Sequence, residues 1–289
     1  MKGIILAAGN GTRLFPASEP VSKILLPVYD KPLIYYPLST LMCAGIRDIM
    51  VITNKTDLNV FKKLLGDGSQ FGVSIEYAIQ PVQRGIADAF IIAESFIGDD
   101  DVCLVLGDNV FYHDDLSKIL KEASSKNAGA TIFGYSVPDP QRFGVIESDA
   151  LGNVISIEEK PSKPKSDVAA VGLYFYGSEV CEIAKKLKPS ARGELEITDL
   201  NRKYLEKGRL RVVRLDKDLL WIDAGTFDSL LDAGILVRSV QRELGKPISC
   251  PEEIALSSGF VSAEDVMKRV ATKKMNEYYR YVSGLCGRP

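Results

Sequence analysis

The chain has 289 residues, of which 46% are hydrophobic and 26% charged, a composition typical of a soluble globular protein with a large core. Its formal net charge of −2 argues against bulk attraction to nucleic acid or to an anionic membrane, so an anionic ligand needs a local cluster of positive side chains. A single histidine, His113, excludes a zinc site built on several histidines, and five cysteines without a CxxC pair predict free thiols in a reducing, cytoplasmic setting.

The first half of the chain alternates between short apolar runs and segments with helical spacing. The apolar runs, rich in Val, Ile and Leu, predict buried strands at residues 3–6, 48–53, 74–79 and 102–106. Helical spacing predicts helices at residues 32–44, 57–65 and 85–96. This alternation is typical of an α/β fold with a Rossmann-like, mostly parallel sheet flanked by helices, in which ligands bind beyond the carboxyl ends of the strands.

The second half adds strands with shorter connections and then ends in helices. Strands are predicted at residues 130–135, 143–148, 154–159, 169–176, 210–215 and 219–223. We expect them to add mixed or antiparallel pairing to the same sheet. Helices are predicted at residues 178–187, 196–207, 226–244, 262–270 and 274–283. The sequence therefore favours one domain over residues 1–289, with an α/β core at 1–225 and a mainly helical segment at 226–289.

The helix predicted at 226–244 has a broad apolar face. Its members are Phe227, Leu230, Leu231, Ile235, Leu236 and Val240. The alternative, that this helix packs back onto its own domain, stays open. Together with apolar residues further along the chain, the face is larger than a small segment is expected to bury alone. We predict a subunit interface here, in a homotetramer with twofold axes.

A loop of small residues follows the first predicted strand. It reads Leu6, Ala7, Ala8, Gly9, Asn10, Gly11, Thr12 and Arg13. Consecutive N–H groups in such a loop can bind an anion, and Arg13 adds a fork of donors suited to phosphate oxygens. A plain tight turn is an equally good interpretation of the loop alone. Lys23, just before the next apolar run, is a candidate second cation for phosphate.

Two aspartates come directly after apolar strands in distant parts of the chain. Asp108 follows the strand at 102–106, and Asp223 ends the strand at 219–223. Mg²⁺ prefers oxygen ligands, commonly one or two carboxylates with phosphate oxygens and water. The pair therefore predicts a magnesium site, although for either residue alone helix capping is the better interpretation.

Further candidates lie after other strands. Gln80, followed by Gly85, offers both a donor and an acceptor to a pyrimidine edge, or is an ordinary polar loop residue. Glu159 could bond sugar hydroxyls, or belong to an exposed charge cluster. Gly144 could allow a sugar to approach closely, or mark a strand bulge. Trp221 could pack on a sugar face, or fill the core.

Taken together, these segments resemble the sugar nucleotidyltransferase family, from about residue 2 to at least residue 278. The most specific segments are LAAGNGTRL, SKILLPVYDKPLIYYPLSTLM, LLGDGSQFG, VLGDN, DPQRFGV, EEKP, LKPSARGELEITDLN, WIDAGT and SCPEEIA. Many long motifs in one order are far more specific than one short motif. Within the family the resemblance is to the thymidylyltransferases, and it implies the nucleotide-diphospho-sugar transferase type of fold.

The resemblance assigns a role to each matching position. Arg13 and Lys23 are expected to be the catalytic cations, and Asp108 and Asp223 the magnesium ligands. The expected nucleotide contacts are Leu6, Ala7, Ala8, Gly9, Gly11, Thr12, Arg13, Gln80, Gly85 and Asp108. The expected contacts to the sugar phosphate are Gly144, Glu159, Lys160, Val171, Trp221 and Arg192.

The implied reaction is Mg²⁺-dependent transfer of a thymidylyl group from dTTP to glucose 1-phosphate, as the first step of dTDP-sugar formation of the dTDP-rhamnose type. Neither nucleic acid nor a membrane is expected as a partner. Two alternatives stay open: a related enzyme that uses UTP or another sugar 1-phosphate, and a non-catalytic sugar-nucleotide sensor. A sensor is expected to have lost Arg13, Lys23 or one of the aspartates, and all are present.

Overall fold

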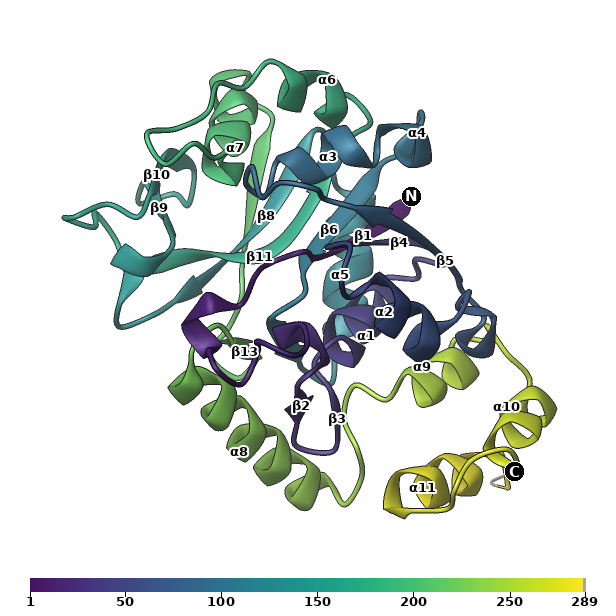
Figure 1. The fold of residues 1–289 in the computed structure, drawn as a ribbon. Coiled ribbons are helices and arrows are strands. Elements are labelled where there is room, and N and C mark those ends of the chain that lie inside the picture. The colour runs from purple at the N-terminus through teal and green to yellow at the C-terminus, as the bar shows by residue number, and fades with distance from the viewer. Residues whose placement is uncertain (288–289) are drawn as a thin grey trace.

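A nine-stranded sheet, counted over residues 1–287 that the structure describes, crosses the middle of the protein in the computed structural model (Figure 1). Seven strands follow the order β10-β9-β11-β6-β1-β4-β5, and β8 joins β11 to β12. The strands of this sheet are β1 (Lys2–Ala7), β4 (Asp48–Thr53), β5 (Ser74–Ile79), β6 (Val102–Leu106), β8 (Ala130–Ser136), β9 (Gly144–Ser148), β10 (Val154–Glu159), β11 (Val168–Tyr176) and β12 (Leu210–Arg214).

The first half of the chain builds the parallel part of the sheet, as its alternating pattern predicts. β1 lies between β4 and β6 and pairs with both in parallel, and β4 pairs in parallel with β5. Neighbouring side chains of β1 enter different cores: Ile5 packs in the larger hydrophobic cluster and Ile4 in the second one. Strands buried on both faces in this way read as continuous apolar runs, which explains why they are visible in the sequence.

The second half adds the predicted antiparallel strands. β11 pairs in an antiparallel manner with β6, β8 and β9, and β9 forms a hairpin with β10. β12 returns to a parallel alignment beside β8. The predicted mostly parallel mixed sheet is therefore confirmed.

Helices cover both faces of the sheet (Figure 1). The larger cluster contains side chains of α1 (Tyr35–Cys43), α2 (Leu58–Leu65), α5 (Leu116–Ser125), α8 (Phe227–Leu244) and α9 (Pro251–Ser257). The second cluster contains side chains of α3 (Asp88–Ile92), α4 (Glu94–Ile97), α6 (Val180–Lys185) and α7 (Ile197–Glu206). No helix within residues 1–287 is long and apolar enough to cross a membrane.

Some elements differ from the expectation. The helix predicted from residue 32 begins at Tyr35, because Lys31 and Pro32 form a short strand, β3 (Lys31–Pro32), that pairs with β2 (Pro27–Val28). The helix predicted at 85–96 is divided into α3 and α4. Besides β2 and β3, the helices α5 and α9 and the strand β7 (Asn109–Tyr112) were not predicted, because each is short or interrupted by polar residues.

The C-terminal helices pack onto the core through a buried ionic and aromatic network. α10 (Ala263–Val270) is capped by Ser262, whose hydroxyl accepts a hydrogen bond from the Asp265 N–H. Arg269 of this helix lies 4.4 Å from the ring centre of Phe71 and 3.2 Å from the carboxylate of Glu252. Tyr278 of α11 (Glu277–Cys286) donates to Glu252 at 2.6 Å. These contacts join α9, α10 and α11 to each other and to the core.

Candidate functional site

A cleft of about 710 Å³ lies beyond the carboxyl ends of β1 and β6, where the sequence places a ligand site. It brings together residues from widely separated regions of the chain. The predicted site residues that line it are Gly9, Gly11, Thr12, Arg13, Lys23, Asp108, Gly144, Glu159, Lys160, Trp221 and Asp223. The structure thus assembles the proposed phosphate, metal and sugar contacts in one place.

The loop after β1 forms one wall of the cleft. Gly11 has a φ of 63°, in the left-handed region, and its carbonyl accepts a hydrogen bond from the Ser18 hydroxyl at 2.7 Å. Leu14 is completely buried and anchors the loop, whereas Arg13 is exposed toward the cleft. Opposite the loop, a Cβ added at Gly225 would come within 2.8 Å of the Arg13 guanidinium. The absence of a side chain at 225 therefore leaves room for Arg13.

Lys23 and Asp108 form an ion pair at the base of the cleft. Lys23 Nζ contacts Asp108 Oδ2, and the two side chains are only 11% and 14% exposed. Asn109 Nδ2 donates to the other Asp108 oxygen at 3.1 Å. Burial alone raises the pKa of Asp108, but the Lys23 charge and these hydrogen bonds outweigh it and hold the pKa below its ordinary value. Asp108 is therefore ionised at neutral pH.

Asp223 lies next to this pair because of a short antiparallel ladder. β13 (Leu220–Asp223) pairs with β7, and Asp223 is opposite Asn109. Burial, followed by the charge of Asp108, raises the pKa of Asp223 to about 6, against the opposing charges of Lys23 and Arg13. Within residues 1–287 no hydrogen bond or ion pair reaches the Asp223 carboxylate. Two neighbouring carboxylates, of which only Asp108 is paired with a lysine, favour an additional cation.

The donor set fits a hard divalent cation that takes its other ligands from substrate and water. Asp108 and Asp223 supply carboxylate oxygens, and the described residues contain no cluster of three or more His, Cys, Asp or Glu side chains that could enclose a metal alone. Mg²⁺ commonly binds through one or two carboxylates and keeps phosphate and water ligands. The residues therefore fit Mg²⁺ better than Zn²⁺, which prefers nitrogen and sulfur.

Asn109 is a site residue that the sequence analysis missed. Its Oδ1 accepts from Trp221 Nε1 at 2.7 Å and from the Gly172 N–H at 3.1 Å, so its Nδ2 must face Asp108. Trp221 is 9% exposed and packs edge-on against Tyr135 and Phe143. It fills core and also holds Asn109 in place. The sequence feature that could have indicated this role is the position of Asn109 directly after Asp108.

The far wall of the cleft is formed by β9, β10 and the start of α7. Glu159 Oε2 accepts from the Thr198 hydroxyl at 2.5 Å, and its Oε1 accepts from Arg192 at 3.3 Å. A Cβ at Gly144 would come within 2.9 Å of the Thr198 hydroxyl, so this glycine keeps the wall open. Lys160 adopts a φ of 42°, a strained conformation for a lysine, and lines the cleft.

The remaining predicted residues do not line the cleft. They are Leu6, Ala7, Ala8, Gln80, Gly85, Val171 and Arg192. Val171 is completely buried. Arg192 Nη2 donates to both carboxylate oxygens of Glu196, at 2.9 and 2.8 Å. Gln83, which the sequence analysis did not choose, lines the cleft instead and donates to the Ala8 carbonyl at 2.7 Å. The cleft is also lined by Arg142, Tyr174 and Thr198. Long-range contacts place these residues there, and a local sequence pattern does not reveal such contacts.

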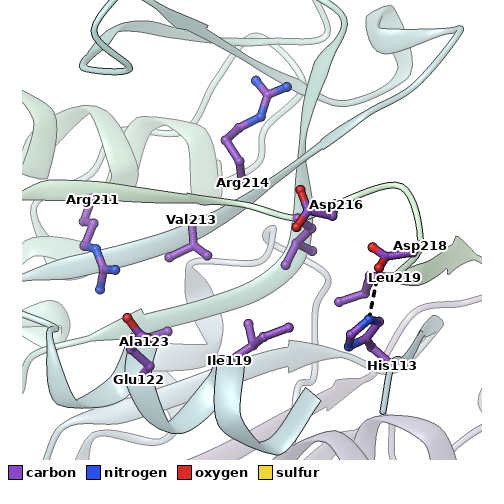
Figure 2. Close-up of a pocket in the computed structure, with 11 residues that line it drawn as sticks. His113, Ile119, Glu122, Ala123, Arg211, Val213, Arg214, Asp216, Asp218 and Leu219 are labelled. Carbon is purple, nitrogen blue, oxygen red and sulfur yellow. Dashed lines mark hydrogen bonds and ion pairs between the residues drawn. The ribbon is translucent and has the colours of Figure 1, made fainter. Parts of the chain in front are cut away.

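The single histidine lies elsewhere. His113 lies at a smaller cavity of about 200 Å³ between α5 and β12, with its Nε2 3.3 Å from Asp218. Figure 2 shows these two side chains facing each other. None of the predicted site residues lines this cavity. The cleft therefore has to work through carboxylates and fixed cations, without an imidazole base.

Comparison with known proteins identifies the family of this chain. Residues 2–239 match the family described as nucleotidyl transferase. A glucose-1-phosphate thymidylyltransferase from Neisseria gonorrhoeae is 55% identical over 288 residues, covering 100% of both chains. A solved Bacillus anthracis structure, assigned as a glucose-1-phosphate thymidylyltransferase and bound to sucrose, is 44% identical with a TM-score of 0.76, covering 82% of this chain and 95% of that one. A UDP-glucose pyrophosphorylase complexed with UDP-glucose shares the fold, with a TM-score of 0.74 at 22% identity over 83% of this chain and 98% of that one.

Proposed function

The chain belongs to the nucleotidyl transferase family, and we propose that within it the protein acts as a glucose-1-phosphate thymidylyltransferase. It transfers a thymidylyl group from dTTP to α-D-glucose 1-phosphate and releases pyrophosphate. The observation that carries the proposal is the cleft in which Arg13 and Lys23 face the carboxylates of Asp108 and Asp223. Such a site collects phosphate groups around fixed positive charge.

The nucleophile is an oxygen of the sugar phosphate. The second pKa of a phosphate monoester is about 6, so this group is largely dianionic at neutral pH and needs no side-chain base. That requirement agrees with a cleft from which His113 is excluded. The chemical obstacle is the repulsion between two strongly anionic substrates that must meet at the α-phosphorus.

The cleft's cations reduce that repulsion. Arg13 is free to contact two phosphate oxygens at once, and Lys23 supplies a point charge fixed by Asp108. N–H groups of the loop at Gly9 to Thr12 are available to the triphosphate. Negative charge is redistributed over the α-phosphoryl oxygens as the new bond forms, so these groups stabilise the transition state more than the bound substrates.

Asp108 and Asp223 are the residues that would hold Mg²⁺. When bound, the ion supplies Lewis-acid charge to phosphate oxygens and helps to align the two substrates. Asn109 and Trp221 keep the Asp108 carboxylate oriented. The sugar is assigned to the wall formed by Gly144, Glu159 and Lys160, where Thr198 orients Glu159.

Three further assignments belong to this proposal. The protein carries out the first step of dTDP-sugar formation of the dTDP-rhamnose type. It forms a homotetramer through the exposed apolar face of α8, where Phe227, Leu231 and Ile235 are about half exposed or more. It works in a reducing, cytoplasmic setting, in keeping with five free cysteines.

The test is a turnover screen of the purified protein over four nucleoside triphosphates and several sugar 1-phosphates, with pyrophosphate as the readout. The expected result is the highest kcat/KM with dTTP and glucose 1-phosphate. A higher kcat/KM with UTP would replace the nucleotide assignment and keep the reaction. Tight binding of substrates without any pyrophosphate would instead identify a sensor.

A further inference from the structure

The side-chain amide of Gln80 donates hydrogen bonds to two groups that can only accept them. Gln80 follows β5 at the start of the loop that leads to α3 (Figure 1), and its side chain is almost completely buried, with the residue 6% exposed. Its Nε2 donates to Asp88 Oδ2 at 3.0 Å and to the Gly85 carbonyl at 3.4 Å. Its backbone N–H donates to the Thr53 carbonyl at 2.9 Å. The residue is thus fixed at both its backbone and its amide.

These two partners determine which way the amide points. A carboxylate and a backbone carbonyl have no proton to donate, so a reversed amide would place its oxygen against two acceptors. Both N–H groups of Gln80 are therefore directed at Asp88 and Gly85. Oε1 accepts no hydrogen bond from any residue in the described part of the chain, and it is not among the fully buried atoms left without a partner. Oε1 is thus the polar atom of Gln80 left for a ligand, on a loop whose residues Gln83 and Ile86 line the cleft.

Asp88 can accept the hydrogen bond from Gln80 at a buried position because Arg84 balances its negative charge. Asp88 is 1% exposed. Arg84 donates to its Oδ1 at 2.7 Å, while Gln80 donates to its other oxygen, Oδ2. A buried carboxylate without such a partner would be unfavourable. Arg84, Asp88 and Gln80 thus form a chain of donors and acceptors with a single consistent direction. Its last member presents an acceptor.

We propose that Asp88 is a positioning residue for base selection: it fixes Gln80 with its carbonyl oxygen free, so that the site accepts a pyrimidine with an N–H at ring position 3 and rejects cytosine. Thymine and uracil carry a proton on N3, whereas N3 of cytosine is an acceptor and would face Oε1 with a second lone pair. The inference rests on the proposed role of Gln80 in base binding. It does not separate dTTP from UTP, which share this edge.

The variant that tests the proposal is Asp88→Asn, which keeps the shape of the side chain. Arg84 can only donate, so it retains the oxygen of the new amide and turns the NH₂ of that amide toward Gln80. Gln80 then has to offer Oε1 to residue 88, and its own NH₂ becomes available to the base. We measure kcat and KM for dTTP and dCTP with glucose 1-phosphate, and the equilibrium binding of both nucleotides, so that base preference is tested with or without turnover.

The wild type is expected to prefer dTTP over dCTP by about 100-fold or more in kcat/KM, as sites that use a buried hydrogen bond do. Asp88→Asn is expected to reduce this preference by about tenfold, the value of one misplaced hydrogen bond. The change should lie mainly in KM and in the dissociation constants, with kcat for dTTP within about threefold of the wild type. General damage to the fold would lower both nucleotides together and leave the ratio unchanged.

Two further variants make the outcome decisive. Arg84→Lys keeps a cation that can only donate beside the Asp88 carboxylate, so the preference is expected to stay within about threefold of the wild type. Gln80→Ala removes the side chain proposed to bind the base and is expected to abolish most of the preference for dTTP over dCTP. An unchanged preference in Asp88→Asn, with a loss in Gln80→Ala, would overturn the inference and leave the proposed function standing. An unchanged preference in both would overturn the base-reading role of Gln80 and the inference with it, again without affecting the reaction.

Discussion

Asp223 lies directly opposite Asn109 in the antiparallel ladder of β13 and β7, and this pairing brings its carboxylate beside Asp108. The ladder is reinforced by a hydrogen bond of 2.9 Å from the Ala224 N–H to the Asp108 carbonyl. Two aspartates from distant strands are therefore fixed by backbone geometry, and Trp221 of the same ladder orients Asn109 between them. The two carboxylates proposed to hold a cation are therefore positioned by the fold itself.

Asp223→Asn is expected to lower kcat by about 100-fold or more, because it removes one of two carboxylates proposed to hold the metal. The fold should survive. Asparagine removes a buried negative charge beside Asp108, so the melting temperature in EDTA is expected to equal or exceed that of the wild type. Steady-state kinetics and thermal unfolding measure the two effects. A near-normal kcat would show that Asp223 has no part in the reaction.

Removal of the divalent cation is expected to abolish turnover without unfolding the protein. Excess EDTA should stop pyrophosphate release, and Mg²⁺ added beyond the EDTA should restore it, because fixed lysine and arginine charges alone do not balance a triphosphate and a sugar phosphate. Far-ultraviolet circular dichroism in EDTA is the control for the fold. Full activity in EDTA would exclude metal dependence.

Arg13→Ala and Lys23→Ala should each lower kcat by about 100-fold, yet differ in their effect on stability. Arg13 is exposed in the cleft and its loss should leave the melting temperature unchanged. Lys23 balances Asp108 where both side chains are largely buried, so its loss should lower the melting temperature by several degrees. Lys126→Ala, which breaks an exposed pair with Glu122, is the control and should change neither quantity. Substitutions that raise KM and preserve kcat would mean that the two cations only gather substrate.

Gly225→Ala is expected to reduce kcat by about tenfold through Arg13. The added methyl group would come within 2.8 Å of the Arg13 guanidinium and 3.1 Å of Asp223 Oδ1, so Arg13 has to move. The matched control is Gly284→Ala on α11, where the methyl group meets no atom within 4 Å and a helical alanine should be mildly stabilising. Equal kcat in both variants would show that the position of Arg13 is not critical.

Leu231→Glu is expected to shift the protein from a tetramer to smaller species. Leu231 is 63% exposed on α8 and lies with Phe227, Ile235 and Tyr29 along an apolar groove. A charge placed there would be buried in the proposed interface. Light scattering after gel filtration measures the mass, and Leu151→Glu, at a hairpin tip that is 88% exposed, is the control. A monomeric wild type at micromolar concentration would refute the interface.

The sequence revealed the parts of the site that depend on local order. Arg13 and Asp108 each follow a buried parallel strand, and parallel strands bring their carboxyl ends to one edge, so their convergence was predictable. The β7–β13 ladder was not, because β7 is a short run in which no apolar alternation stands out. Three further contacts depend on tertiary structure and could not be predicted. They are the ion pair of Lys23 with Asp108, the hydrogen bond from Asn109 to Asp108 and the hydrogen bond from Thr198 to Glu159. Gln83 was missed for the same reason, since its partner Ala8 lies far away in sequence.

The most direct test of the account is ³¹P nuclear magnetic resonance of the purified protein with dTTP, glucose 1-phosphate and Mg²⁺. We expect the resonances of both substrates to decline together and those of dTDP-glucose and pyrophosphate to appear in equal amounts. Asp223→Asn, followed under the same conditions, should leave the spectrum nearly unchanged. Formation of dTMP or inorganic phosphate without a sugar nucleotide, or an unchanged spectrum with the wild type, would contradict the proposed function.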